Sequence, residues 1–310
     1  IDQNSLKRVA VDTTVMEKAI AHPTESRLLD RARSQLVALA QEAGIDLRQS
    51  YARLSPRLAL QVGRYAHAKQ FKRMRKALKR LKGYTGRVMR DLRRHLQDIP
   101  EGDLRKRITA RLALVSQLLH QPAKGGNRIY ALHAPEVDCI AKGKARVRYE
   151  FGCKVSIATS LDEGFILGMR SFAGNPYDGH TLREALEQVE ILTDHRPELA
   201  VVDRGYRGHG ETKTRVLISG TRRGLTPKLI ADLRRRSAIE PEIGHMKTDG
   251  RLSRCPLKGA TGDAIFAVLC ACGHNIRKVL AHLRLWLACI MATIWAAAGR
   301  ASHAFNALSF

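Results

Sequence analysis

Three carboxylates are placed along the chain where a sheet of strands and helices could bring them together. Asp12 lies in VAVDTTV, a β-branched and apolar run that predicts a buried strand, and Asp203 directly follows the apolar run ELAVV. Glu240 lies at the end of the helical segment LTPKLIADLRRRSAIE. Carboxylate oxygens suit Mg²⁺, and two such ions about 3.5–4 Å apart can activate one oxygen and stabilise another in phosphodiester chemistry.

Taken singly, each acid also has an ordinary interpretation. An aspartate in a strand is often an edge or capping residue, and an aspartate before a glycine-rich turn, such as Asp203, is often part of that turn. Glu240 alone carries no signal. In NPYDGHT we expect Asp178 and His180 to cap the following helix rather than to support metal ligands.

Three further side chains lie close to these segments. We expect His209 and His245 to contact DNA or solvent rather than a metal. Tyr206 has two equally open interpretations, stacking on a base or packing on the edge of the sheet.

The elements that must position the acids alternate between strands and helices. The pattern predicts antiparallel strands over 149–158 and 164–172 joined by LDEG, a helix opened by Thr181, strands over 198–202 and 215–219, and helix from Leu225 onward. Such an order indicates an α/β layered sheet, in which polar residues at strand ends are natural ligand positions.

The segment from 24 to about 120 differs in character, because Leu, Ala, Arg and Lys dominate it and turns are few. It predicts a helical hairpin or small bundle, followed by a linker at 121–128. Its middle, from Arg64 to Arg94, is overwhelmingly positive, whereas a solvated helix face normally mixes both signs. We expect this run to contact phosphates through Lys72, Arg73, Arg75, Lys76, Lys79 and Arg80.

Composition points to the same class of partner. The chain has 310 residues, 44% hydrophobic and 27% charged, which is typical of a folded protein of one or two domains rather than a disordered one. Its net charge of +25 favours nucleic acid, although a ribosome, an anionic membrane surface or a merely basic protein also fits.

The cysteines and termini add a few expectations. Six irregularly spaced cysteines indicate reduced thiols, and we do not expect zinc at the C-x-C-x-H cluster of Cys270, Cys272 and His274, because no second ligand pair is nearby. No signal peptide is visible, and the apolar stretch 285–298 is shorter than the roughly 20 residues of a membrane span, which favours a buried terminal helix. Because the chain begins with Ile1, we expect an N-terminal part to be missing.

Three motifs carry a family resemblance. VDTTV, VVDRGYRGHG and RRRSAIEPEIGHMK resemble the acidic motifs of the DDE transposases of bacterial insertion sequences, in particular the IS-five family of the IS-four superfamily. That family has a signature of Tyr, Arg, Glu and Lys at fixed spacing, and Arg236, Glu240 and Lys247 match its last three members, whereas Leu233 stands at the Tyr position. HAPEVDCIAKGKARVRYEFGCKVSIAT and AGNPYDGHTL add to a resemblance that runs from about residue 12 to 283.

The resemblance implies an α/β, RNase H-like mixed sheet flanked by helices, with a long basic helical insertion after the first strand. Residues 1–23 would form the first strand of the core, 24–125 the insertion, 126–283 the rest of the core and 284–310 a C-terminal helical tail. Asp12, Asp203 and Glu240 would be catalytic and would hold two Mg²⁺ ions, for which Mn²⁺ can substitute.

The resemblance also implies partners. DNA, as element ends and target, would contact Arg236 and Lys247, with Arg204 and Tyr206 beside the site. Two ends must be held together, so we expect self-association on DNA, no membrane, and a bacterial cytoplasmic, nucleoid-associated protein.

Two questions stay open at the third acid. Pro241 kinks or breaks a helix, unless Ser237 and Glu240 form a capping box that starts a new one. Glu242 is an alternative third ligand, although the motif spacing favours Glu240. The function has two alternatives: an inactive transposase remnant that only binds DNA, and another nuclease on a similar fold.

Overall fold

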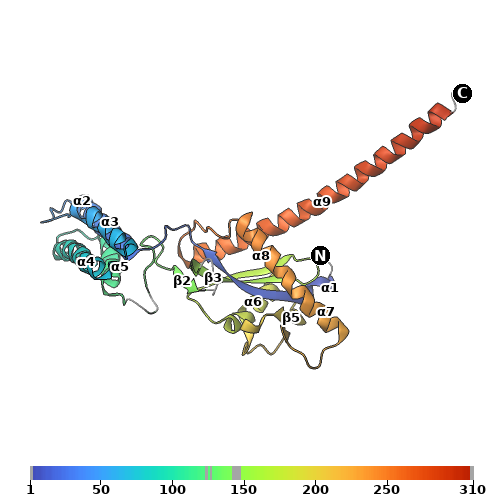
Figure 1. The fold of residues 1–310 in the computed structure, drawn as a ribbon, viewed down its shortest axis with the longest axis horizontal. Helices are drawn as coiled ribbons and strands as arrows, with labels where there is room; N and C mark the ends of the chain where they lie inside the picture. The colour runs from blue at the N-terminus through green and yellow to red at the C-terminus, as the bar shows by residue number, and fades with distance from the viewer. Residues whose placement is uncertain (1–2, 123–124, 126–127, 142–147, 308–310) are drawn as a thin grey trace. The chain divides into compact units, whose positions relative to one another are not determined.

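The computed structural model describes residues 3–122, 125, 128–141 and 148–307 (Figure 1). The chain divides into two compact units. The first consists of Ile1–Glu17 together with Lys154–Phe310, and the second of Lys18–Cys153. The predicted basic insertion lies inside the second unit, which extends beyond it at both ends.

The first unit is built on a mixed sheet with the order β3-β1-β5-β6, in which β4 also pairs with β3. β1 pairs with β5, and β5 with β6, in parallel, whereas β3 and β4 are antiparallel. The predicted strands are all present: β1 (Arg8–Glu17), β3 (Tyr149–Ser160), β4 (Ile166–Phe172), β5 (Leu199–Val202) and β6 (Arg215–Ile218).

Helices cover both faces of this sheet because side chains alternate along its strands. Val9 and Val11 of β1 pack with Leu182 and Leu186 of α6 (Asp178–Thr193) on one face. Ala10 faces the other way and clusters with residues of α7 (Pro227–Arg235) and α8 (Ile239–Thr248). The sheet therefore has a packed layer on each side, as the alternating pattern predicts.

The segment that carries Glu240 is interrupted before the glutamate. α7 is followed by η2, a 3₁₀ turn (Arg236–Ala238), and α8 then begins at Ile239. Pro241 thus lies in the first turn of a helix, where its missing N–H costs little. The expected capping box is absent, because the N-cap is Ala238 and the Ser237 hydroxyl donates to the Arg234 carbonyl at 3.0 Å.

The last helix, α9 (Gly259–Ala307), is longer than predicted (Figure 1). It docks on β4, where the Asn275 side chain bonds both the N–H and the carbonyl of Ile166 at 2.8 Å. Beyond this contact the expectation of a buried terminal helix is wrong for the described side chains, since Trp286 is 67% exposed and Trp295 78%. Residues Gly259–Trp295 are long and apolar enough to cross a membrane by length and composition, a test that core helices of soluble proteins also pass.

The second unit is a helical bundle with a short strand pair. Its helices are α2 (Glu25–Glu42), α3 (Leu54–His67), α4 (Phe71–Arg94) and α5 (Asp103–His120). Leucines and valines from all four form one core, which confirms the predicted bundle. β2 (Asp138–Ala141) pairs antiparallel with the first residues of β3. Of the expected linker at 121–128, residues 123, 124, 126 and 127 lie outside the described residues.

Candidate functional site

The parallel register of β1 and β5 brings the two aspartates level with each other. Arg8 pairs with Leu199 and Ala10 with Val201, so the same offset sets Asp12 beside Asp203 at the ends of the paired segments. One Asp12 oxygen, Oδ1, accepts the Thr13 N–H at 2.7 Å, which fixes that carboxylate. The prediction that strand order would bring these acids together is therefore consistent with the register.

Asp203 belongs both to a turn and to this group of acids. Its Oδ1 accepts the Gly205 N–H at 2.8 Å and so caps η1, a 3₁₀ turn (Arg204–Tyr206). Its other oxygen, Oδ2, lies 3.8 Å from Nη2 of Arg236. Turn chemistry and a role in the site are thus compatible here, because the two oxygens serve different neighbours.

Arg236 lies among all three predicted acids. Its Nη2 is 3.1 Å from Asp12 Oδ2, and its Nη1 is 3.6 Å from Glu240 Oε1, in addition to the contact with Asp203. The Arg236 side chain is only 15% exposed, so these contacts are poorly screened by water. Residues far apart in the sequence, from β1, from the end of β5 and from α8, therefore meet at one cation.

The structure separates the two candidate glutamates. Glu240 is 63% exposed and its contact is with Arg236. Glu242 is 18% exposed and faces α9, where its oxygens lie 2.6 Å from Lys278 Nζ and 3.0 Å from His274 Nε2. Glu242 therefore ties α8 to α9, and Glu240 is the glutamate that shares Arg236 with the aspartates.

Asp178 does not cap its helix, contrary to the sequence expectation. The N-cap of α6 is Tyr177, which makes no side-chain cap bond, and Asp178 is the first residue of the helix. Its Oδ1 instead accepts the Thr13 hydroxyl at 2.8 Å and the Lys154 ammonium at 2.9 Å. A fourth carboxylate therefore lies against the residue that follows Asp12.

Tyr206 packs rather than stacks. Its ring is fully buried in the cluster that includes Val202 and Leu182, so it cannot lie against a base in this arrangement. Burial, together with the nearby charges of Asp12, Asp178 and Asp203, raises the pKa of its hydroxyl well above the usual value. The predicted DNA contact by Tyr206 is therefore wrong for this structure, and packing against the sheet is the observed role.

The remaining predicted residues are distributed around this group. Arg204 is exposed, and Lys247 lies seven residues along α8 from Glu240, roughly 10 Å along the axis. His245 pairs with Asp249 at 3.1 Å and is largely exposed, whereas Nδ1 of His209 accepts the Glu211 N–H at 2.9 Å.

The donor set fits hard divalent cations in its chemistry. Three carboxylates surround one guanidinium and attract its positive charge. Carboxylate oxygens are also ligands that Mg²⁺ prefers, and Mg²⁺ sites often use only one or two carboxylates together with water. As the side chains stand, no group of three or more His, Cys, Asp and Glu in the described part of the chain is arranged to hold an ion. Asp12 and Asp203 both approach the same nitrogen of Arg236, Nη2.

The C-x-C-x-H segment lies on α9 with its side chains in different surroundings. Cys270 is buried and donates to the Gly250 carbonyl at 3.3 Å, and burial raises the pKa of its thiol to about 11. Cys272 is exposed, whereas His274 faces Glu242.

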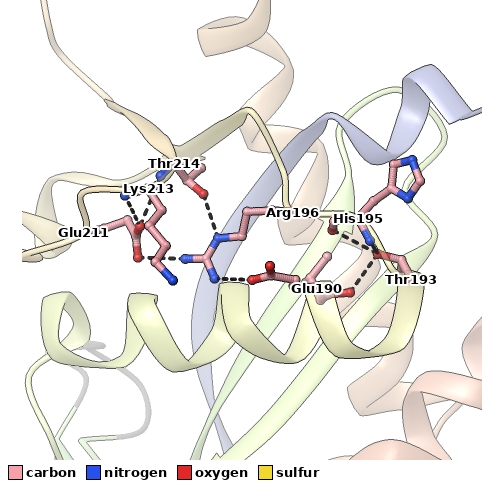
Figure 2. A network of polar contacts seen from close by, with 8 residues as sticks. Glu190, Thr193, His195, Arg196, Glu211, Lys213 and Thr214 are labelled. Atoms are coloured by element: carbon pink, nitrogen blue, oxygen red, sulfur yellow. Dashed lines mark hydrogen bonds and ion pairs between the residues drawn. The ribbon is translucent and has the colours of Figure 1, made fainter.

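An ion-pair network around the buried Glu211 holds the loop that follows Asp203, and sequence reasoning missed it (Figure 2). Arg196 contacts Glu190 at 2.8 Å, Glu211 at 3.0 Å and the Thr214 hydroxyl at 3.1 Å. Burial alone would raise the pKa of Glu211, but the N–H groups of Lys213 and Thr214, with Arg196, hold it below the ordinary range. The sequence signal was an acid three residues before Thr214, a spacing that suits a carboxylate accepting nearby N–H groups.

α4 carries the predicted cations on one side and the bundle core on the other. Its buried residues include Ala77, Leu81, Val88 and Leu92. The six predicted cations are all exposed, and among the described residues none of them forms an ion pair: Lys72, Arg73, Arg75, Lys76, Lys79 and Arg80. The only acid of α4, Asp91, is buried against Arg48 and Arg94.

Comparisons with known proteins agree with these observations. A family model described as "Transposase DDE domain" matches residues 120–276, just over half of the chain. ORF8 in the nfe locus of Rhizobium meliloti, an uncharacterised protein, is 61% identical over 67 residues, which are 22% of this chain and 32% of that protein. The match thus spans about a third of this relative's length, and no solved structure matches. With just over half of its length matched by the family model, the chain belongs to the transposase DDE domain family.

Proposed function

We propose that this protein cuts DNA at the ends of an insertion sequence and joins the ends to target DNA, with Asp12, Asp203 and Glu240 as metal ligands. The observation that carries the proposal is the convergence of these three carboxylates on the guanidinium of Arg236. Membership of the transposase DDE domain family supports it, although the family match begins at residue 120 and does not include Asp12.

The residues divide the chemistry between them. Bound Mg²⁺ or Mn²⁺, two ions in our proposal, would activate the attacking oxygen and stabilise the leaving one. The three carboxylates would hold the ions, and Arg236 would turn from the acids to a phosphate. Nε of Arg236 supports this role, because it is buried and has no hydrogen-bond partner among the described residues, so its N–H can donate to a phosphate oxygen.

The finer assignments belong to the same proposal. The spacing of Arg236, Glu240 and Lys247 supports the IS-five family, and the strand order supports an RNase H-like core. The exposed cations of α4 would contact the DNA backbone, together with Arg204 and Lys247. Two DNA ends would be held by two copies of the chain, in a bacterial cytoplasm.

A strand-transfer assay tests the proposal. The full chain is incubated with a labelled duplex that carries the element's own end, a supercoiled target, and MgCl₂ or MnCl₂. We expect metal-dependent cleavage and joining, and complete loss of joined product in Asp12→Ala, Asp203→Ala and Glu240→Ala. These variants should bind the duplex as tightly as the parent, because the acids repel phosphates rather than attract them.

Glu242→Gln is the matched control, since it removes a neighbouring carboxylate that faces α9. It should retain joining. Joined product from Asp203→Ala would show that the acids are wrongly assigned. Salt-dependent DNA binding without cleavage in either metal would instead identify an inactive remnant, and cleavage without joining would identify a nuclease.

A further inference from the structure

A buried lysine holds the fourth carboxylate of the site. Lys154 of β3 donates from Nζ to Asp178 Oδ1 at 2.9 Å and to the Pro176 carbonyl at 2.6 Å. Its side chain is only 9% exposed. A buried ammonium group keeps its charge only when it is paired and hydrogen-bonded, so these two acceptors hold the Lys154 ammonium in one position.

Asp178 connects that lysine to the segment of Asp12. The oxygen that accepts from Lys154 also accepts the Thr13 hydroxyl at 2.8 Å. Thr13 in turn donates its backbone N–H to Asp12 Oδ1. The orientation of the Asp12 carboxylate therefore depends on a residue that Asp178 holds in place.

The other oxygen of Asp178 lies against the turn of Asp203. A Cβ atom added to Gly205 would be 3.2 Å from Asp178 Oδ2 and 2.9 Å from Asp203 Oδ1, so the two carboxylates flank this glycine. Like charges placed this closely repel each other, and Lys154 supplies the compensating cation. One lysine–aspartate pair thus holds the residue that follows Asp12 and lies beside the turn of Asp203.

We propose that Lys154 and Asp178 form a positioning pair that sets the spacing of Asp12 and Asp203 for a shared divalent ion. The proposal rests on the proposed function, because it assumes that these aspartates bind metal. In this scheme Asp178 is not itself a ligand; it acts through its Oδ1, which accepts from Lys154 and Thr13.

The test is a titration of the full chain with Mn²⁺ in the absence of DNA, followed by electron paramagnetic resonance of the free ion. Residues that orient metal ligands typically change metal affinity about 10- to 100-fold, so Asp178→Ala and Lys154→Met should each weaken Mn²⁺ binding at least about tenfold. The double variant should be no weaker than either single one, because the two residues act as a unit. Asp178→Asn keeps an oxygen for Thr13 and Lys154, and should stay within about threefold of the parent.

Lys18→Met is the matched control for loss of a buried lysine. Lys18 lies in the second unit, is 3% exposed and contacts Glu136 at 3.1 Å. It should lower the thermal stability without changing the affinity for Mn²⁺. Thr13→Val tests the same link without altering Asp178, so it stays informative if Asp178→Ala does not fold. It removes only the hydroxyl that donates to Asp178, and it should weaken Mn²⁺ binding at least about threefold.

Several results would overturn the proposal. Parent-like Mn²⁺ affinity in Lys154→Met and Thr13→Val would leave the pair a purely structural role. A loss in Asp178→Asn as large as in Asp178→Ala would show that its charge, and not its position, matters. If Asp12→Asn fails to weaken Mn²⁺ binding, the proposed metal site is itself wrong; if it does weaken binding while Lys154→Met does not, only the positioning pair is refuted.

Discussion

The basic face of α4 makes a quantitative prediction about salt. Lys72 and Lys79 each lie three or four residues from both Arg75 and Lys76, so the four form one stripe opposite the buried side of the helix. With Arg73 and Arg80 they give six cations free to neutralise phosphates. Affinity for duplex DNA falls with a log–log salt slope of about 0.9 per neutralised phosphate, so full engagement predicts a slope near 5.4 and roughly a thousandfold loss between 50 and 200 mM salt.

Removing two of these charges should lower that slope by a calculable amount. Lys76→Gln with Lys79→Gln should reduce it by about 1.8 in fluorescence-anisotropy titrations of a labelled duplex across that salt range. Lys106→Gln with Arg107→Gln removes the same charge from exposed positions of α5, where Arg107 is already paired with Glu42, and should leave the slope nearly unchanged. Equal slopes for the two double variants, with unfolding temperatures like the parent, would refute a phosphate-binding role for α4.

Three further predictions follow from other contacts. Gly205→Ala places a Cβ 2.9 Å from Asp203 Oδ1, so strand transfer should fall by roughly 10²-fold while the unfolding temperature changes little; a parent-like rate would show that this carboxylate can move freely. Glu242→Gln leaves Lys278 without its ion-pair partner and should lower the free energy of unfolding by about 2 kcal/mol in urea titrations, and no change would mean that α9 docks through other contacts. The pKa of Glu211 is lowered in the fold, so the stabilisation of the fold by this carboxylate should be complete above the ordinary glutamate pKa and decline as pH falls through the lowered value. Glu211→Gln should weaken this acid-side decline in the free energy of unfolding. Identical pH profiles for the parent and the variant would contradict the prediction.

Much of the fold could be predicted because its strands have a clear sequence pattern. The runs around Asp12 and before Asp203 are short, β-branched and apolar, and each became a strand of the sheet. Helical periodicity likewise predicted the bundle of the second unit. The long exposed course of α9 could not be predicted, because an apolar run is the same in sequence whether or not another surface covers it.

The site was predicted less completely, since its contacts join distant segments. Spacing selected Glu240 over Glu242, but only the packing of α9 shows that Glu242 is held by Lys278. The sequence position of Asp178 predicts helix capping, whereas the long-range bonds from Thr13 and Lys154 decide its actual surroundings. Local patterns carry no information about such partners until the topology is known.

In the sequence the second unit interrupts the first, and this order has a consequence for synthesis. β1 ends at Glu17, yet β5, its parallel partner, begins only at Leu199. A ribosome adding about 5–20 residues per second needs roughly ten to forty seconds to cover that interval. During this time the helical unit can fold on local contacts, whereas β1, which carries Asp12, has no β5 to pair with. Newly made chains should therefore be most prone to aggregate before β5 emerges, and least prone once β1 and β5 have paired.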